Sequence, residues 1–172
     1  VLFRVALFAN AMAETAIPEA RSRIAALPES YEILKQRHVE LHRPLFLRTD
    51  IALDTAVDER STEELLLGAY DGTVPARLIE TMFDFGRYLL ISSSRPGGLP
   101  ANLQGIWNGE WNPPWQSDFH NDENIQMNYW QALPGNLPET LEPFFSYFES
   151  MVPDYRENAK KVYGCRGILL PI

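Results

Sequence analysis

The sequence predicts a mainly α-helical protein with a short strand at its start. Apolar residues recur at intervals of three and four over most of the 172 residues, which is the spacing of helices that bury one face. Proline, glycine and serine interrupt this pattern at a few places and separate the predicted helices. The apolar and aromatic contents, 45% and 12%, are those of a folded protein with a core of its own.

The predicted strand covers residues 1–9, where Arg4 alone interrupts the apolar side chains. A secretion signal would carry a basic region ahead of its apolar run, and this segment has none. The chain starts at Val1 and stops inside the apolar run 167–172, so we expect it to be a segment of a longer protein. No run reaches the ~20 apolar residues that a membrane-spanning helix needs, and we expect no membrane partner.

Helical segments follow before residue 70. Residues 17–46 place apolar side chains at helical spacing among Arg, Lys and Glu, and we expect a break at Pro28. Residues 61–68 begin with Ser61, Thr62 and two glutamates ahead of three leucines. This order predicts a short, capped helix.

A longer helix is predicted over 75–92. Four of its apolar residues fall at intervals of four, three and four: Leu78, Met82, Phe85 and Leu89. They form one stripe, widened by Ile79, Phe83 and Leu90, which we expect to face the core. The serines, proline and glycines of 92–98 end this helix and begin a loop that runs to about residue 121.

Two more helices are predicted after the loop. The first spans 123–133 and ends at the Pro134-Gly135 pair. The second runs from Leu141 to Val162 along one apolar face, with a kink at Pro153.

Charge and cysteine content bear on several classes of function. With 15 basic and 23 acidic residues the net charge is −8, which repels phosphates, so we expect no nucleic-acid partner. Cys165 is the single cysteine and has no second thiol for a disulfide or a metal. His38 and His42 have the i, i+4 spacing of zinc ligands, but the sequence offers no convincing third ligand, and we expect no metal site.

The long loop and the start of the next helix combine indole rings with amide side chains. Trp107, Trp111 and Trp115 lie among many amides and carboxylates. A sugar site needs flat apolar rings for the C–H face of a pyranose and polar groups for its hydroxyls. The alternative is structural, with amides that cap helices and close turns and tryptophans that pin the loop to the core.

Several runs of this region resemble glycoside hydrolase family 95, the 1,2-α-L-fucosidase family. The first two runs are FGRYLLISSSRPGG at 85–98 and PANLQGIWN at 100–108. Shorter runs follow in the same order: NPPW at 112–115, SDFH at 117–120 and NIQMNYW at 124–130. A match of this length and order is more specific than a short motif.

The resemblance implies an (α/α)6 barrel, a six-hairpin toroid, preceded by a linker and a β domain. On this basis 1–17 would end the β domain, 18–60 would form linker helices, and 61–172 would be the first part of the catalytic barrel. It also implies inverting hydrolysis of terminal α-L-fucosyl or related linkages in oligosaccharides and a secreted or periplasmic location. The acid and the base of the family lie farther along the chain, so the segment alone is expected to be inactive.

Family site residues carry over at three positions of this sequence, and two more residues are expected to join them. Asn124 matches an asparagine that orients and activates the attacking water, and Asp122 stands where its partner asparagine is usual. His120 matches a sugar contact, and we expect Trp115 and Asn128 to shape the sugar pocket with it. No cofactor is implied. The structural alternative for His120 is a histidine that closes the loop.

Two departures from the family leave other functions open. Asp122 places a carboxylate close to the chemistry, and after residue 167 the chain continues with apolar residues where relatives are rich in His and Asn. The sugar specificity could therefore be that of an α-L-galactosidase or another (α/α)6 glycosidase. A noncatalytic carbohydrate-binding protein of the same fold would suit the loop equally well.

Overall fold

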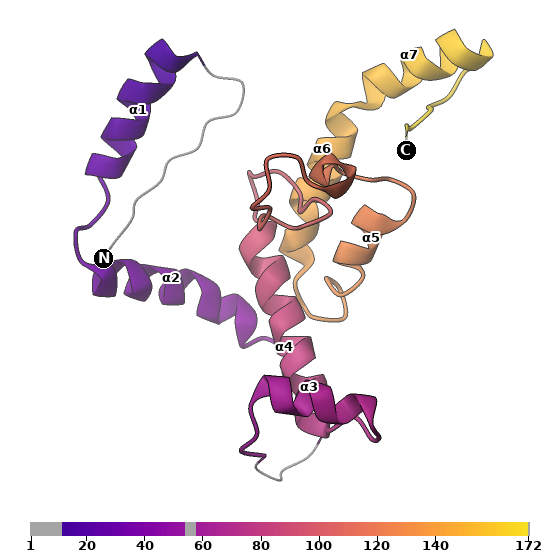
Figure 1. Cartoon of the computed structure of the whole chain (residues 1–172). Helices are drawn as coiled ribbons and strands as arrows, with labels where there is room; N and C mark the ends of the chain where they lie inside the picture. Colours follow the sequence, from indigo (N-terminus) through magenta and orange to yellow (C-terminus); the bar gives the residue numbers. More distant parts are fainter. Residues whose placement is uncertain (1–11, 54–57, 172) are drawn as a thin grey trace. The chain divides into compact units, whose positions relative to one another are not determined.

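The computed structural model describes residues 12–53 and 58–171. Contacts divide the chain into two compact units, Val1–Arg43 and Pro44–Ile172. In the described residues the regular structure consists of seven α-helices and two short 3₁₀ helices, with no β-strand (Figure 1). The prediction of a mainly α-helical protein is confirmed. The strand expected at 1–9 lies outside the described residues.

The first unit contains helix α1 (Ala13–Ala25) and most of helix α2 (Tyr31–Phe46). The residues between them include Pro28, which confirms the predicted break. His38 and His42 stack on each other in α2, with ring centroids 5.4 Å apart. Among the described residues, no group of three His, Cys, Asp or Glu side chains is arranged to hold a metal ion.

Helix α3 (Thr62–Tyr70) begins with the cap that its sequence predicts. The Ser61 hydroxyl accepts a hydrogen bond from the backbone N–H of Glu64 at 3.2 Å, and the Glu64 carboxylate accepts one from the backbone N–H of Ser61 at 2.8 Å. This reciprocal pair satisfies two of the backbone donors that a helix start leaves open.

Helix α4 (Ala76–Ser93) buries only part of the predicted stripe, and this part includes Leu78 and Leu90. Leu78 is buried, but Met82 and Phe85 are 64% and 59% exposed. The buried residues farther along are Arg87, Leu90 and Ile91. Because α4 carries apolar residues around most of its circumference, its own pattern does not select the buried side. The neighbouring segments select it.

The next helix is shorter than predicted. Helix α5 (Asn124–Tyr129) gives way to turns well before the predicted end at residue 133. Pro134 lacks an N–H and disfavours a helical residue before it, so the helix cannot run into the Pro134-Gly135 pair. At Gly135 a side chain would meet the backbone oxygen of Gln131 at 2.7 Å, which explains the need for glycine in this turn.

The long helix predicted at 141–162 is two helices, α6 (Leu141–Ser150) and α7 (Val152–Tyr163). A 3₁₀ turn, η2 (Pro138–Thr140), leads into α6. The prediction of a single kinked helix is wrong, since the chain breaks at Met151. Pro153 causes the break because its ring excludes the carbonyl of Glu149, four residues earlier.

The core of the second unit joins α4, the long loop and α5. Its buried members are Leu45, Leu90, Ile91, Ala101, Ile125, Tyr129, Ala132 and Leu137. Phe144 and Phe148 of α6 pack against this cluster. In Figure 1 the loop that follows α4 lies at the end of this helix, with α5 and α6 beside it. The core thus fixes both ends of the loop.

Arg87 lies at the centre of a buried joint. Its guanidinium donates to the carbonyls of Phe46 and Thr49 at 2.5 and 2.9 Å, and to those of Leu45 and Gly135 at 3.0 and 3.3 Å. Its side chain is 0% exposed. Burial lowers the pKa of this guanidinium from its ordinary value. One cation therefore satisfies backbone groups of the segment 45–49 and of the turn before α6.

A chain of hydrogen bonds through Tyr129 attaches the start of the loop to α5. The Tyr129 hydroxyl accepts from the Ala101 backbone N–H at 2.8 Å and lies 2.7 Å from the Ser94 hydroxyl, which donates to the Thr140 carbonyl at 2.8 Å. Because Ser94 has one proton and gives it to Thr140, Tyr129 donates to Ser94. Each polar group in this series of hydrogen bonds therefore has a partner.

We expect Tyr129→Phe to lower the free energy of unfolding around α5 by about 1–3 kcal/mol, because the buried Ala101 N–H loses its acceptor. Burial raises the pKa of Tyr129 above the ordinary 10.0, although its bonds with Ser94 and Ala101 lower it. The folded protein therefore holds the Tyr129 proton more tightly than the unfolded chain does. The protonated hydroxyl contributes fully to the free energy of unfolding below pH 10, and this contribution is lost as the pH rises through the raised pKa.

Hydrogen exchange at α5 in the full-length protein, measured from pH 8 to pH 11, tests both effects. The Phe variant should be less protected and should lose less protection above pH 10. Tyr70→Phe, at an 81% exposed position of α3, is the matched control. Equal protection of wild type and Tyr129→Phe would contradict the role of the hydroxyl.

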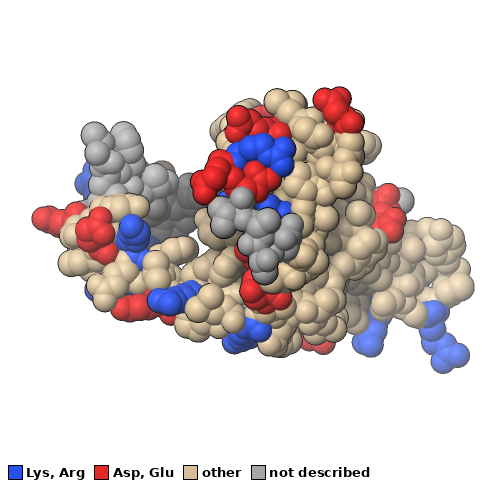
Figure 2. Space-filling view, turned by 90° about the horizontal axis from the view of Figure 1, so that it is seen from below, with Lys and Arg blue, Asp and Glu red and all other residues tan. Residues whose placement is uncertain are grey.

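Charged residues are dispersed over the surface. On the face drawn in Figure 2, acidic and basic side chains are interspersed among wide areas that carry neither. No helix of the described residues has both the length and the apolar character needed to cross a bilayer.

Candidate functional site

Asn102 organises the loop between α4 and α5. Its side-chain oxygen accepts hydrogen bonds from the Gln104 backbone N–H at 2.8 Å and from the Ser117 hydroxyl at 3.1 Å. Its backbone oxygen accepts from the Asn128 side-chain amide at 2.8 Å. One residue thereby links the two arms of the loop to each other and to α5.

A cavity of about 300 Å³ lies between α4, this loop and α5. Its wall combines amide groups, an indole ring and aliphatic side chains, which belong to Leu89, Leu90, Ser93, Leu103, Gln104, Trp107, Met127, Asn128 and Gln131, among others. Gly105 is required beside it, because its φ is +66° and a side chain there would come within 2.7 Å of the Trp107 ring. An indole with amides is a suitable lining for one sugar ring.

A second group of side chains surrounds His120. Its Nδ1 lies 3.0 Å from an Asp118 carboxylate oxygen, and its Nε2 lies 3.4 Å from an Asp122 carboxylate oxygen. The Trp115 ring meets the imidazole at an interplanar angle of 60°, with centroids 5.6 Å apart. Two carboxylates, an imidazole and an indole thus lie within eight residues of sequence at the entrance to α5.

The backbone around this group adopts rare conformations. Trp115, Gln116 and Ser117 have φ values of +54°, +57° and +52°, and Glu123 has +94°. Residues other than glycine adopt such values at a cost, typically of ~1–3 kcal/mol each, when the surroundings hold them there. Trp115 and Gln116 belong to the 3₁₀ turn η1 (Pro114–Ser117), which ends directly before Asp118.

The structure brings together three of the five predicted site residues. Asp122 and Trp115 each contact His120. Asn124, the first residue of α5, is exposed and follows Asp122 by two positions. Asn128 lines the cavity, whose wall includes none of the other four.

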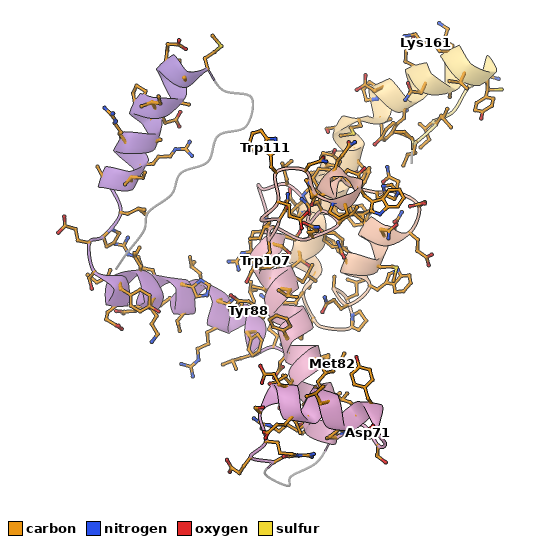
Figure 3. All side chains as sticks on the ribbon, in the orientation of Figure 1. Asp71, Met82, Tyr88, Trp107, Trp111 and Lys161 are labelled. Atoms are coloured by element: carbon orange, nitrogen blue, oxygen red, sulfur yellow. The ribbon has the colours of Figure 1, made fainter. Side chains whose placement is uncertain are left out.

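Residues outside the predicted site also contribute to these surfaces. Trp107, Gln104 and Gln131 line the cavity, and Asp118 contacts His120. Gln131 follows Asn128 by three positions, a helical spacing that signals a shared face. Figure 3 shows Trp111 extending away from the loop, and its side chain is fully exposed.

Residues 30–171 match the family model described as the glycosyl hydrolase family 95 catalytic domain. The chain belongs to glycosyl hydrolase family 95. The resemblance found in the loop motifs is thereby confirmed, and these motifs lie inside the matched range.

Individual relatives of the family 95 chain are fucosidases by name. Alpha-L-fucosidase 2 of Arabidopsis thaliana is 41% identical over 87% of this chain and 18% of its own length. The probable alpha-fucosidase A of Aspergillus niger is 38% identical over 81% of this chain and 18% of its own, and that of Aspergillus oryzae is 35% identical over 83% and 20%. The chain spans about a fifth of the length of these curated relatives.

Proposed function

We propose that this chain is the sugar-binding and water-orienting part of a glycosidase that removes terminal α-L-fucosyl residues from oligosaccharides with inversion. The observation that carries the proposal is the contact of Asp122 and Trp115 with His120 directly before Asn124. The names of the relatives support the substrate class.

In this proposal the residues divide into two roles. Asp122 and Asn124 place or activate the attacking water, because a carboxylate and an amide two positions apart offer the acceptors that fix a water molecule. His120, Trp115 and Asn128 shape the sugar pocket, together with the indole and amides of the cavity wall. The acid and the base of inverting hydrolysis come from the longer protein, so the chain alone is inactive.

We also propose that the chain belongs to an (α/α)6 barrel, with linker helices up to residue 60 and a preceding β domain that ends before α1 begins at Ala13. The exposed apolar side of α4 supports this. Ile79, Met82, Phe85 and Tyr88 are spaced by three and are 39–64% exposed. Such a stripe is typical of a helix that packs against further helices of the same domain.

The proposal is tested on the full-length protein by following hydrolysis of 2'-fucosyllactose and of matching α-L-galactosides by NMR. We expect free fucose to appear first as the β-anomer, since inversion places water on the face opposite the leaving group. A reaction without protein is the control. Release of galactose alone would make the protein an α-L-galactosidase, and binding without hydrolysis would make it a noncatalytic carbohydrate-binding protein.

A further inference from the structure

Asp118 is the part of the His120 group to which the proposed function assigns no role. Its carboxylate oxygen lies 3.0 Å from His120 Nδ1, within hydrogen-bond distance. On the opposite side of the ring, Nε2 faces Asp122 at 3.4 Å. The imidazole therefore lies between two carboxylates, one at each nitrogen.

Other contacts hold the main chain of His120 and one side of its ring. The backbone oxygen of His120 accepts from the Ile125 N–H at 3.0 Å, which fixes the main chain but not the ring. Trp115 contacts it edge-on at 5.6 Å and limits one side. The His120 side chain is 19% exposed, against 46% for Asp118 and 54% for Asp122. The Asp118 carboxylate adds a hydrogen-bond partner at Nδ1 that restrains rotation of the ring.

The contact with Asp118 decides which nitrogen of the His120 ring carries a proton. An acceptor at Nδ1 places a proton on that nitrogen, so the neutral ring presents the Nε2 lone pair and the protonated ring presents a second N–H. In both forms Nε2, and not Nδ1, is the atom that faces Asp122. A proton on Nε2 lets the ring donate toward the Asp122 carboxylate and orient it, whereas an Nε2 lone pair would repel the carboxylate.

We propose that Asp118 is a positioning residue that acts through His120 to hold the Asp122 carboxylate in place beside Asn124. The inference rests on the proposed function, in which Asp122 places the attacking water. It extends that function to a carboxylate that would itself touch neither water nor sugar.

Removal of the Asp118 side chain leaves the loop intact. The loop is tied through the Asp118 backbone oxygen, which accepts from the Leu103 N–H at 3.0 Å and is unchanged by substitution. The side chain itself is nearly half exposed, so its loss opens no cavity. A loss of activity would therefore report on His120 and not on folding.

The experiment compares Asp118→Ala and Asp118→Asn in the full-length protein with 2'-fucosyllactose. Loss of an orienting partner should lower kcat of the Ala variant by up to about 10²-fold, and KM should rise as well because His120 also shapes the sugar pocket. The Asn variant keeps an acceptor for Nδ1–H and should recover most of kcat. Glu110→Ala, which removes another exposed carboxylate of the loop, is the control and should match wild type.

Equal kcat for Asp118→Ala and wild type would overturn the inference and leave the proposed function standing. Inactivity of the wild type on every glycoside would instead defeat the proposed function. A crystal structure of Asp118→Ala then decides the positioning role without activity: a turned His120 ring with Nε2 away from Asp122 supports it, and an unmoved ring overturns it.

Discussion

Replacement of Arg87 by methionine is expected to lower the free energy of unfolding around α4 by about 3–5 kcal/mol. Methionine fills much of the same space but donates no hydrogen bond, so four carbonyl groups at Leu45, Phe46, Thr49 and Gly135 lose their shared partner. The guanidinium is fully buried, and water cannot replace it without opening the joint. Rings of Phe46 and Phe83 within 6 Å of the cation add to the loss.

Native-state hydrogen exchange at the α4 amides of the full-length protein measures this change. Arg77→Met, at an exposed position of the same helix, removes a positive charge without touching the joint and should leave protection unchanged. Arg87→Lys should lie between the two, because an ammonium has three donors on one atom and cannot reach both sides of the joint. Unchanged protection in Arg87→Met would refute the role of the guanidinium.

Asp122→Ala is expected to lower kcat of the full-length protein by about 10²-fold or more, the cost of misplacing a reacting group such as the attacking water. Alanine cannot accept a proton or a hydrogen bond, so the water beside Asn124 would lose one of its two anchors. The side chain is 54% exposed, and its removal should leave thermal unfolding unchanged. Steady-state rates with 2'-fucosyllactose measure the effect.

Asp122→Asn separates two roles for this carboxylate. If Asp122 only orients the water, an amide should preserve most of kcat, because its oxygen accepts the same hydrogen bond. If the carboxylate takes the proton of the water, the Asn variant should be as slow as the Ala variant. Unchanged turnover in Asp122→Ala would remove this residue from the mechanism.

Local rules predicted the helix ends that depend on neighbours in sequence. The Ser61–Glu64 cap and the break at Pro28 follow from residues a few positions apart, and both are present. The buried side of α4 could not be predicted in this way, because Arg87 is placed by carbonyls 38 to 48 residues away. A buried arginine in an apolar stripe has no signature in helical periodicity.

The candidate site also contains residues that are close in sequence and residues that only the fold brings together. Trp115, His120 and Asp122 are close in sequence, so a local sequence motif was enough to predict that they share a site. The cavity brings Gln131 of one segment to Gly86 of another, where the Gln131 amide donates to the Gly86 carbonyl at 3.2 Å. Only the fold of the loop over α4 creates that wall, and for this reason the sequence did not assign Gln131 or Trp107 to the site.

The joint at Arg87 also sets an order of events during synthesis. Its last acceptor, the carbonyl of Gly135, leaves the ribosome 48 residues after Arg87 itself. The other three acceptors, the carbonyls of Leu45, Phe46 and Thr49, precede Arg87, so α4 can dock on the segment 45–49 first and the turn at Gly135 then closes the joint. The joint should therefore reach its full stability only after the chain beyond α5 has been made.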